Sequence, residues 1–339
     1  MQVELTPGPL LDQKGNLVQA GYAKQLVKDY DRRAIKAAKH RIKEWDYYFI
    51  GNSKYGIALT IADNSYMGLV SVTFFDFAKR TEHTKTAMTI LPMGKLNFPS
   101  TSQKGDLFFE NKEMKLSFLN DGKTRHLVCQ IDHFLNDMKL QCDITLNETL
   151  TDTMVIATPF DKPQHFYYNQ KINCLLANGN VQIGLENYNF DAATGVLDWG
   201  RGVWTYQNTW YWSSLSAIQG KKTIGFNLGY GFGDTSKATE NMLYYDKKGY
   251  KIDQVWFQIP TNAKHQDDYM QPWHFTSNDQ SLDLSFHPLL DRHSNTSLGV
   301  ISSLQHQVFG LFRGWIRIDN KKIEITDLLG FAEKVKNKW

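Results

Sequence analysis

Cysteine is scarce in the sequence, and its arrangement indicates neither a cross-link nor a metal site. The 339 residues include only Cys129, Cys142 and Cys174, an odd number without a Cys-x-x-Cys spacing. Zinc-type spacing of Cys and His is also missing, as are the glycine-rich GxGxxG and Walker-type loops that bind nucleotides. We therefore expect buried free thiols in a reducing compartment, with neither structural zinc nor a bound nucleotide.

Long apolar runs are missing as well. No segment approaches the roughly 20 consecutive apolar residues that cross a bilayer as a helix, so we expect no integral membrane segment. The first residues, MQVELTPGPLLDQ, lack the basic start and apolar stretch of a secretory signal peptide. Both absences favour a cytoplasmic protein, and they leave peripheral contact with a membrane open.

A strong charge of one sign is the third absence. The net charge is +3, whereas a dedicated nucleic-acid-binding protein needs a clustered basic face. The basic stretch Lys24–Lys43 carries apolar residues at the spacing of a short, weak helix (Ile35, Ala38, Ile42 and Trp45). It is either a contact for an anionic membrane or phosphate group, or a solvated face. The interleaved Asp29 and Asp31 favour the solvated face, and we expect no nucleic-acid partner.

Aromatic residues, by contrast, are abundant: 9 Trp, 16 Tyr and 20 Phe make up 13% of the chain. Aromatic and β-branched residues suit β-strands. From Trp45 onward, short runs of them alternate with turn signals, of which Asp121-Gly122 and Asn178-Gly179 are typical of hairpins. Regularly spaced strands without intervening helices favour an all-β fold of antiparallel barrels or sandwiches.

The length exceeds what one hydrophobic core usually supports, so we expect two domains. Pro159 and Pro163 interrupt the strand pattern, and we place the boundary there, which gives domains 1–163 and 164–339. The final segment, Thr326–Trp339, has a different pattern. Its apolar residues recur every three or four positions and its last turns carry lysines, which predicts one amphipathic helix that packs against the second barrel.

Five segments together resemble a bacterial family of unknown function: TPGPLLDQKG at 6–15, RIKEWDYY at 41–48, DWGRGVWTY at 198–206, QHQVFGLFRG at 305–314 and LLGFAEKVKNKW at 328–339. More remotely, that family is similar to the two-domain lipocalin-like superfamily of carotenoid 1,2-hydratases and tocopherol cyclases. The resemblance implies two tandem lipocalin-like (calycin) barrels and apolar, lipid-like or isoprenoid-like ligands. It also implies that no metal or organic cofactor is used.

The segment Val203–Ser213 is the most informative for a binding site. If it forms one strand, alternation places five side chains on one face: Trp204, Tyr206, Asn208, Trp210 and Trp212. In a small barrel such a face points inward, where it either fills the core or lines a cavity for a small apolar ligand. Packing is the favoured interpretation for Trp204. For Asn208, Trp210 and Trp212 we favour a ligand wall, because a lone amide among indoles needs a partner.

Asp198 and Arg201 are the candidate catalytic residues, because they begin this aromatic strand. A carboxyl in aromatic surroundings can stay protonated near neutral pH and donate its proton to an alkene. The alternative is an ion pair between Asp198 and Arg201 that holds the start of the strand, and we favour this pair. No residue spacing points to a metal site.

A second polar set, Asp283, Ser285 and His287, alternates on one predicted strand face and suggests a hydrolytic triad. Residues two apart on a strand are separated by about 6.5–7 Å, which is too far for the hydrogen bonds that a triad needs. We therefore interpret the three as the solvent-facing side of the strand.

Three functions remain open. The chain is a cofactor-independent hydratase, cyclase or hydrolase for an apolar substrate, a non-catalytic carrier of a hydrophobic ligand, or an interaction scaffold whose barrels are filled by side chains. An enzyme needs an acid that faces the cavity, whereas a carrier needs only an apolar wall.

Overall fold

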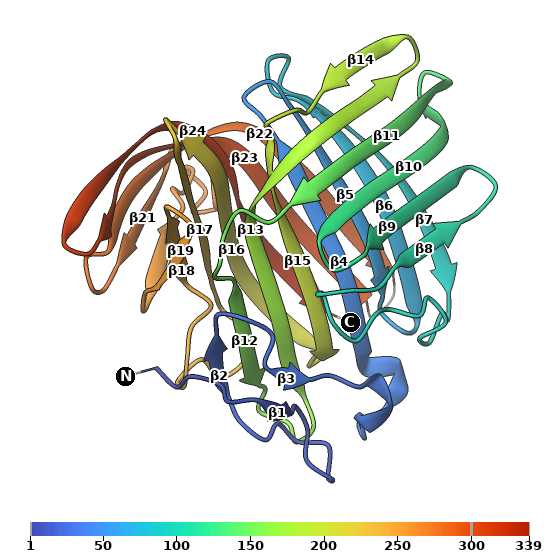
Figure 1. Cartoon of the computed structure of the whole chain (residues 1–339), viewed down its shortest axis with the longest axis vertical. Helices are drawn as coiled ribbons and strands as arrows, with labels where there is room; N and C mark the ends of the chain where they lie inside the picture. The colour runs from blue at the N-terminus through green and yellow to red at the C-terminus, as the bar shows by residue number, and fades with distance from the viewer. Residues whose placement is uncertain (1, 299–300, 339) are drawn as a thin grey trace.

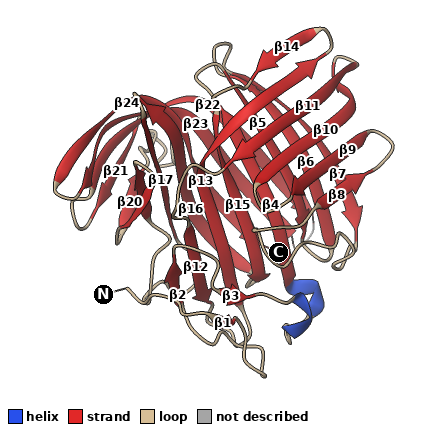
Figure 2. Cartoon of the chain, viewed as in Figure 1, coloured by secondary structure: helices blue, strands red, loops and turns tan. Residues whose placement is uncertain are grey.

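The computed structural model describes residues 2–298 and 301–338, and nearly all of its regular structure is β (Figures 1 and 2). Within these residues the strands form a 13-stranded and a 9-stranded sheet, both antiparallel, and a parallel sheet of two short strands in the N-terminal arm. No helix among them is long and apolar enough to cross a membrane.

The larger sheet follows the order β7-β6-β5-β4-β15-β13-β11-β10-β9-β8. In addition, β12 and β14 pair with β13, and β2 pairs with β12. Its strands are β2 (Gly21–Ala23), β4 (Ile42–Gly51), β5 (Tyr55–Asp63), β6 (Met67–Asp76), β7 (Thr81–Ile90), β8 (Leu107–Glu110), β9 (Met114–Asn120), β10 (Thr124–Leu135), β11 (Met138–Asn147), β12 (Met154–Pro159), β13 (Phe166–Ile183), β14 (Glu186–Asn189) and β15 (Thr194–Val203).

The smaller sheet follows the order β19-β18-β17-β16-β24-β23-β22-β21-β20. Its strands are β16 (Gln207–Gln219), β17 (Lys222–Tyr230), β18 (Met242–Tyr245), β19 (Lys248–Lys251), β20 (Val255–Gln258), β21 (Trp273–Ser277), β22 (Leu282–Leu298), β23 (Ile301–Ile318) and β24 (Lys321–Lys338). The N-terminal arm adds β1 (Gly8–Pro9), β3 (Lys28–Asp29) and two short 3-10 turns, η1 (Arg32–Ala34) and η2 (Lys39–Arg41). The weak helix expected over the basic stretch is therefore reduced to these two turns.

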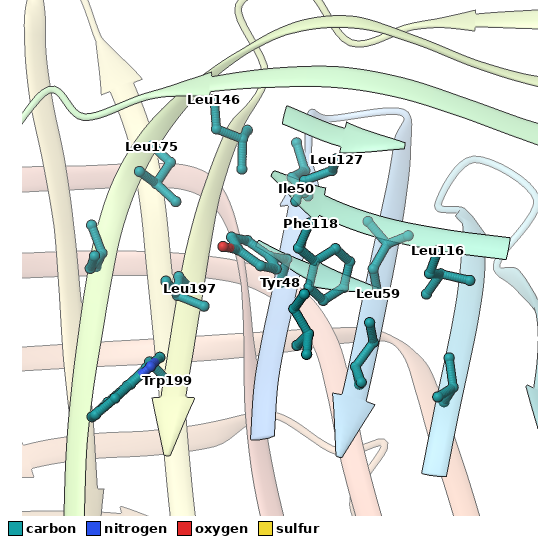
Figure 3. Packing of buried hydrophobic residues seen from close by; sticks show 14 of the residues in the cluster. Tyr48, Ile50, Leu59, Leu116, Phe118, Leu127, Leu146, Leu175, Leu197 and Trp199 are labelled. Carbon is teal, nitrogen blue, oxygen red and sulfur yellow. The ribbon is translucent and has the colours of Figure 1, made fainter. Parts of the chain in front are cut away.

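Each sheet curls around its own apolar core, and the two sheets also pack against each other. Tyr48, Phe118 and Trp199 belong to the core of the larger sheet (Figure 3). Two further clusters join residues of both sheets, one around Tyr167 and Trp204 and the other around Phe309. In Figure 3 the strands of the smaller sheet pass behind β4 and β15 and run across them. The central strands of the larger sheet are consequently buried on both faces.

Two further sequence expectations need correction. The C-terminal helix is absent, because residues 321–338 form β24, which pairs with β16 and β23. One face of β24 meets the larger sheet and the other meets the core of its own sheet, so apolar residues on both faces imitate helical spacing. Asn178-Gly179 is not a turn. Gly179 lies inside β13, where a Cβ would lie 2.1 Å from the Asp143 carbonyl oxygen of the neighbouring strand.

The expected domain boundary falls between β12 and β13, which are paired neighbours in the larger sheet. The chain passes to the smaller sheet only between Val203 and Gln207. The division into two separately folding domains stays a prediction. The Asp121-Gly122 hairpin is confirmed, since it joins β9 and β10.

Phe309 tests how much the contact between the sheets contributes to stability. It is fully buried and its ring centroid lies 4.3 Å from that of Phe75 and 4.9 Å from that of Phe49. We expect Phe309→Ala to lower the free energy of unfolding by about 3–5 kcal/mol, because it empties space that neither sheet can refill. Phe108→Ala is the control, since Phe108 is exposed, and it should change stability by less than about 0.5 kcal/mol. Urea denaturation of both variants measures the difference, and equal losses would contradict the expectation.

Candidate functional site

Four buried charged residues meet between the two sheets, and we call them the charge cluster: Lys171, Asp198, Glu240 and Glu333. Lys171 in β13 and Asp198 in β15 are opposite each other in register, and Nζ lies 2.7 Å from Oδ1. Both point away from the core of the larger sheet because they alternate with core residues along their strands. Glu333 in β24 and Glu240, just before β18, come from the smaller sheet, and all four side chains are buried.

Indole rings surround the charge cluster and bind its acids. Trp45 Nε1 donates to Asp198 Oδ2 at 3.1 Å, and Trp210 Nε1 donates to Glu333 Oε1 at 2.9 Å. The Lys171 ammonium lies 4.0 Å from the centroid of the Trp212 ring, a cation–π contact. Indole rings therefore contact three of the four charged groups.

Amide side chains complete the hydrogen bonding. Asn169 Nδ2 donates to Asp198 Oδ1 at 2.6 Å, and Gln307 Nε2 donates to Glu333 Oε2 at 3.1 Å. Asn227 links the remaining parts: its Oδ1 accepts from Trp212 Nε1 at 2.8 Å and its Nδ2 donates to the Glu240 carbonyl oxygen at 2.7 Å. This network fixes the positions of the acids.

Burial raises the pKa of both glutamates to about 7. For each of them the nearby Lys171 lowers the pKa and the Asp198 carboxylate raises it again. Hydrogen bonds from Trp210 to Glu333 and from Asn227 to Glu240 lower the two pKa values, but by less than burial raises them. Two carboxyl groups that titrate near neutral pH can each give or take a proton under ordinary conditions.

A cleft of about 240 Å³ opens between the sheets near the charge cluster. Its lining includes Val196, Ser214 and Phe331. Val196 and Phe331 are two positions from Asp198 and Glu333, so each shares a strand face with a member of the cluster at a spacing of about 7 Å. A second, polar cleft of about 180 Å³ includes Asn208 and Asn337, at the other end of the β16–β24 pair.

The residues predicted for catalysis are separated by the structure. Asp198 belongs to the charge cluster, but Arg201 points to the opposite face of β15, into the larger sheet's interior. There its guanidinium binds Asp46 at 2.9 Å and lies 4.1 Å from the Trp199 ring centroid. The prediction of an ion pair between Asp198 and Arg201 is therefore wrong, because residues three apart on a strand point to opposite faces.

The predicted aromatic strand is interrupted, since β15 ends at Val203 and β16 begins at Gln207. Trp210 and Trp212 do share a face, but that face meets the larger sheet instead of lining the second barrel. Trp204 is buried against Tyr167 and Phe232, which matches the packing interpretation. Tyr206 is exposed, and Asn208 bonds to Thr205 at the start of β16.

Lys171, Glu240 and Glu333 were missed by sequence reasoning. The isolated lysine in the segment KINCLLA, in which Asn173 is the only other polar residue, was the available signal for Lys171. Glu333 fitted the polar face of the helix predicted over Thr326–Trp339.

The second polar set does not form a triad. Ser285 Oγ does lie 3.2 Å from His287 Nε2, closer than strand spacing predicts, because the side chains lean together. Asp283, however, binds His274 instead of His287.

Two curled antiparallel sheets, each around its own core and joined in one chain, define a two-barrel lipocalin-like protein. The chain belongs to the family described as domain of unknown function DUF2804, whose model matches residues 2–339. No curated protein matches it. The fold is similar to that of a Nitrosomonas europaea protein provisionally assigned as AttH, with a TM-score of 0.55 and 11% identity over 87% of this chain and 92% of the other. It is also similar to kievitone hydratase from Nectria haematococca, with a TM-score of 0.52 and 11% identity over 98% of each chain.

The ion pair between Lys171 and Asp198 can be tested by removing either partner. Lys171→Met removes the ammonium that pairs with Asp198, and we expect it to cost about 3–5 kcal/mol of unfolding free energy at pH 8. Asp198→Asn should cost less, because Glu240 and Glu333, whose pKa values are about 7, are largely ionised at pH 8 and keep negative charge near the ammonium. Urea denaturation of both variants gives the order, and a larger loss for Asp198→Asn would contradict it.

The raised pKa of Glu333 predicts a definite dependence of stability on pH. The folded protein binds this proton more tightly than the unfolded chain does. The resulting stability is present below pH 4.5 and is lost as the pH rises through about 7. Glu333→Gln removes this titration. The unfolding free energy of the variant, relative to that of the unchanged protein, should therefore rise by about 3 kcal/mol between pH 4 and pH 8. Glu324→Gln, at an exposed position of the same strand, is the control. Parallel pH profiles for all three proteins would disprove the assignment.

Proposed function

We propose that the protein is a cofactor-independent enzyme that adds water to, or removes water from, an apolar substrate bound between its two sheets. The observation that carries this proposal is the pair of buried glutamates, Glu240 and Glu333, whose pKa values are raised to about 7. A carrier needs only an apolar wall, and it would gain nothing from two buried acids beside a fixed ion pair.

Glu333 is the group that we assign to proton transfer. It shares a face of β24 with Phe331, which lines the larger cleft, so it lies one strand repeat inward from the cleft. In the protonated state Glu333 gives its proton to one carbon of an alkene. The other carbon becomes electron-poor, and the faces of Trp212 and Trp210 can stabilise it.

Water completes the reaction. A water molecule attacks the electron-poor carbon and loses one proton to a carboxylate, either Glu240 or the newly ionised Glu333. When Glu333 takes this proton, the acids return directly to their original state. When Glu240 takes it, the proton passes from Glu240 to Glu333 through solvent before the next cycle. In both cases one alkene and one water are converted to one alcohol. The reverse sequence is a dehydration.

Asp198 has a different part in this proposal from Glu333. The Lys171 ammonium, the Trp45 indole and the Asn169 amide all contact its carboxyl group and hold it in place. We assign Asp198 and Lys171 to positioning, as a fixed pair of charges that sets the proton affinity of the two glutamates. Arg201 lies outside the site.

Cyclisation begins with the same protonation, and hydrolysis would use a carboxylate to activate water, so the product separates these reactions. Transport of a hydrophobic ligand without turnover is the second candidate. The cleft and its apolar residues, including Phe49, Val196 and Leu329, are the observation in its favour.

The experiment offers the protein three probes: kievitone, oleic acid and geranylgeraniol, each in water enriched in oxygen-18. We expect at least one probe to gain one labelled water, as measured by mass spectrometry. Glu333→Gln should lose at least about a hundredfold in rate, while tryptophan fluorescence shows that the probe still binds. Glu324→Gln should act like the unchanged protein.

Binding without any product, unaffected by Glu333→Gln, would favour the carrier. A product formed equally well by Glu333→Gln would remove Glu333 from the mechanism.

A further inference from the structure

An exposed apolar surface lies at the end of β7, at one edge of the larger sheet, far from the charge cluster in the fold. We call it the apolar tip: Met88, Ile90, Leu91 and Met93. Their exposed fractions are 68%, 89%, 56% and 39%. Large apolar side chains that are exposed singly are common, whereas four of them within six residues mark a surface that contacts something.

The backbone of the apolar tip is held in an unfavourable conformation. Leu91 and Met93 both have a φ of 50°, in the left-handed region that bulky side chains rarely adopt. Neither residue gains burial in return. Such strain persists only where the surrounding structure imposes it, and it is concentrated at functional surfaces.

Hydrogen bonds hold the tip in this position. The amide of Leu91 donates to the Tyr66 carbonyl oxygen at 3.1 Å, and the amide of Met93 donates to the Ser65 carbonyl oxygen at 3.2 Å. The amide of Gly94 donates to Asp63 Oδ2 at 2.7 Å. The tip is therefore a fixed projection of the fold rather than a loose loop.

Positive charge lies next to the tip. Residues 32–43 include six Lys or Arg and no acidic residue. Arg32 touches the tip's turn, since a Cβ on Gly94 would lie 2.7 Å from its Nε. Part of this charge is used inside the protein, because Arg32 pairs with Glu44 and Arg33 with Asp31. Other basic side chains of this region are exposed: Lys36, Lys39, His40 and Lys95.

We propose that the apolar tip docks on an anionic lipid surface. The apolar side chains would enter the region between headgroups and acyl chains, while the neighbouring lysines would lie at the level of the negative headgroups. A second copy of the chain fits this surface less well. In a symmetric dimer, the tip of one copy and its neighbouring cations would pack against the tip and cations of the other copy, so like charges would face each other.

The test uses vesicles of phosphatidylcholine alone and of phosphatidylcholine mixed with phosphatidylserine. We expect the full-length protein to sediment with the mixed vesicles, less so as salt is added, and weakly with phosphatidylcholine alone. The variant Leu91→Asn/Met93→Asn should bind about tenfold more weakly. It should fold normally, because Asn tolerates the left-handed backbone.

Leu185→Asn is the matched control, since Leu185 is completely exposed in the turn between β13 and β14, and its binding should be unchanged. Lys36→Glu/Lys39→Glu should remove the preference for phosphatidylserine.

Equal binding by the tip variant and the Leu185 control would overturn the proposal. So would sedimentation analysis that shows a dimer which the tip variant dissociates, because the tip would then be an interface between copies. The vesicle-binding result does not depend on the outcome of the hydration experiment, because the apolar tip and the charge cluster share no residue.

Discussion

The packing of the smaller sheet onto the outer face of the larger one is the constraint on which the rest of the structure depends. In a single antiparallel barrel that outer face would meet water and could be polar throughout. Here β4 and β13 turn aromatic residues such as Tyr47, Phe49 and Tyr167 toward the smaller sheet and the segments beside it. Their polar residues are then removed from water too, and each needs a partner on the facing sheet or on its own.

The charge cluster follows from this constraint. Lys171 and Asp198 occupy positions that would be ordinary surface positions in one barrel, and the second sheet turns them into a buried ion pair. A buried pair rarely adds stability compared with well-packed apolar residues. The cluster also adds two acids whose burial disfavours their charge, so its composition is better explained by chemistry than by stability.

The sequence predicts the fold class well and the site only in part. Strand composition and turn signals such as Asp121-Gly122 act locally, and the all-β architecture follows from them. The C-terminal strand escapes prediction because a strand buried on both faces loses its alternation, and residues 328–335 then also fit a helix. The partner of Asp198 could not be inferred because strand pairing brings Lys171 opposite it across a register that no local signal specifies. The indoles of β16 were recognised, but which sheet they face depends on a contact between distant segments.

The N-terminal arm has a consequence for how the chain assembles during synthesis. Its strand β2 pairs with β12 in the larger sheet, while the Gln2 side chain donates to the Ile252 carbonyl oxygen and accepts from the Thr239 amide. The central strand β4 likewise has to wait for β15 as its neighbour. Contacts so distant in sequence make folding slow. A ribosome releases the first residues long before their partners exist, so the edge of β4 that later pairs with β15 stays unpaired on the nascent chain. Protection by a chaperone would matter most during that interval.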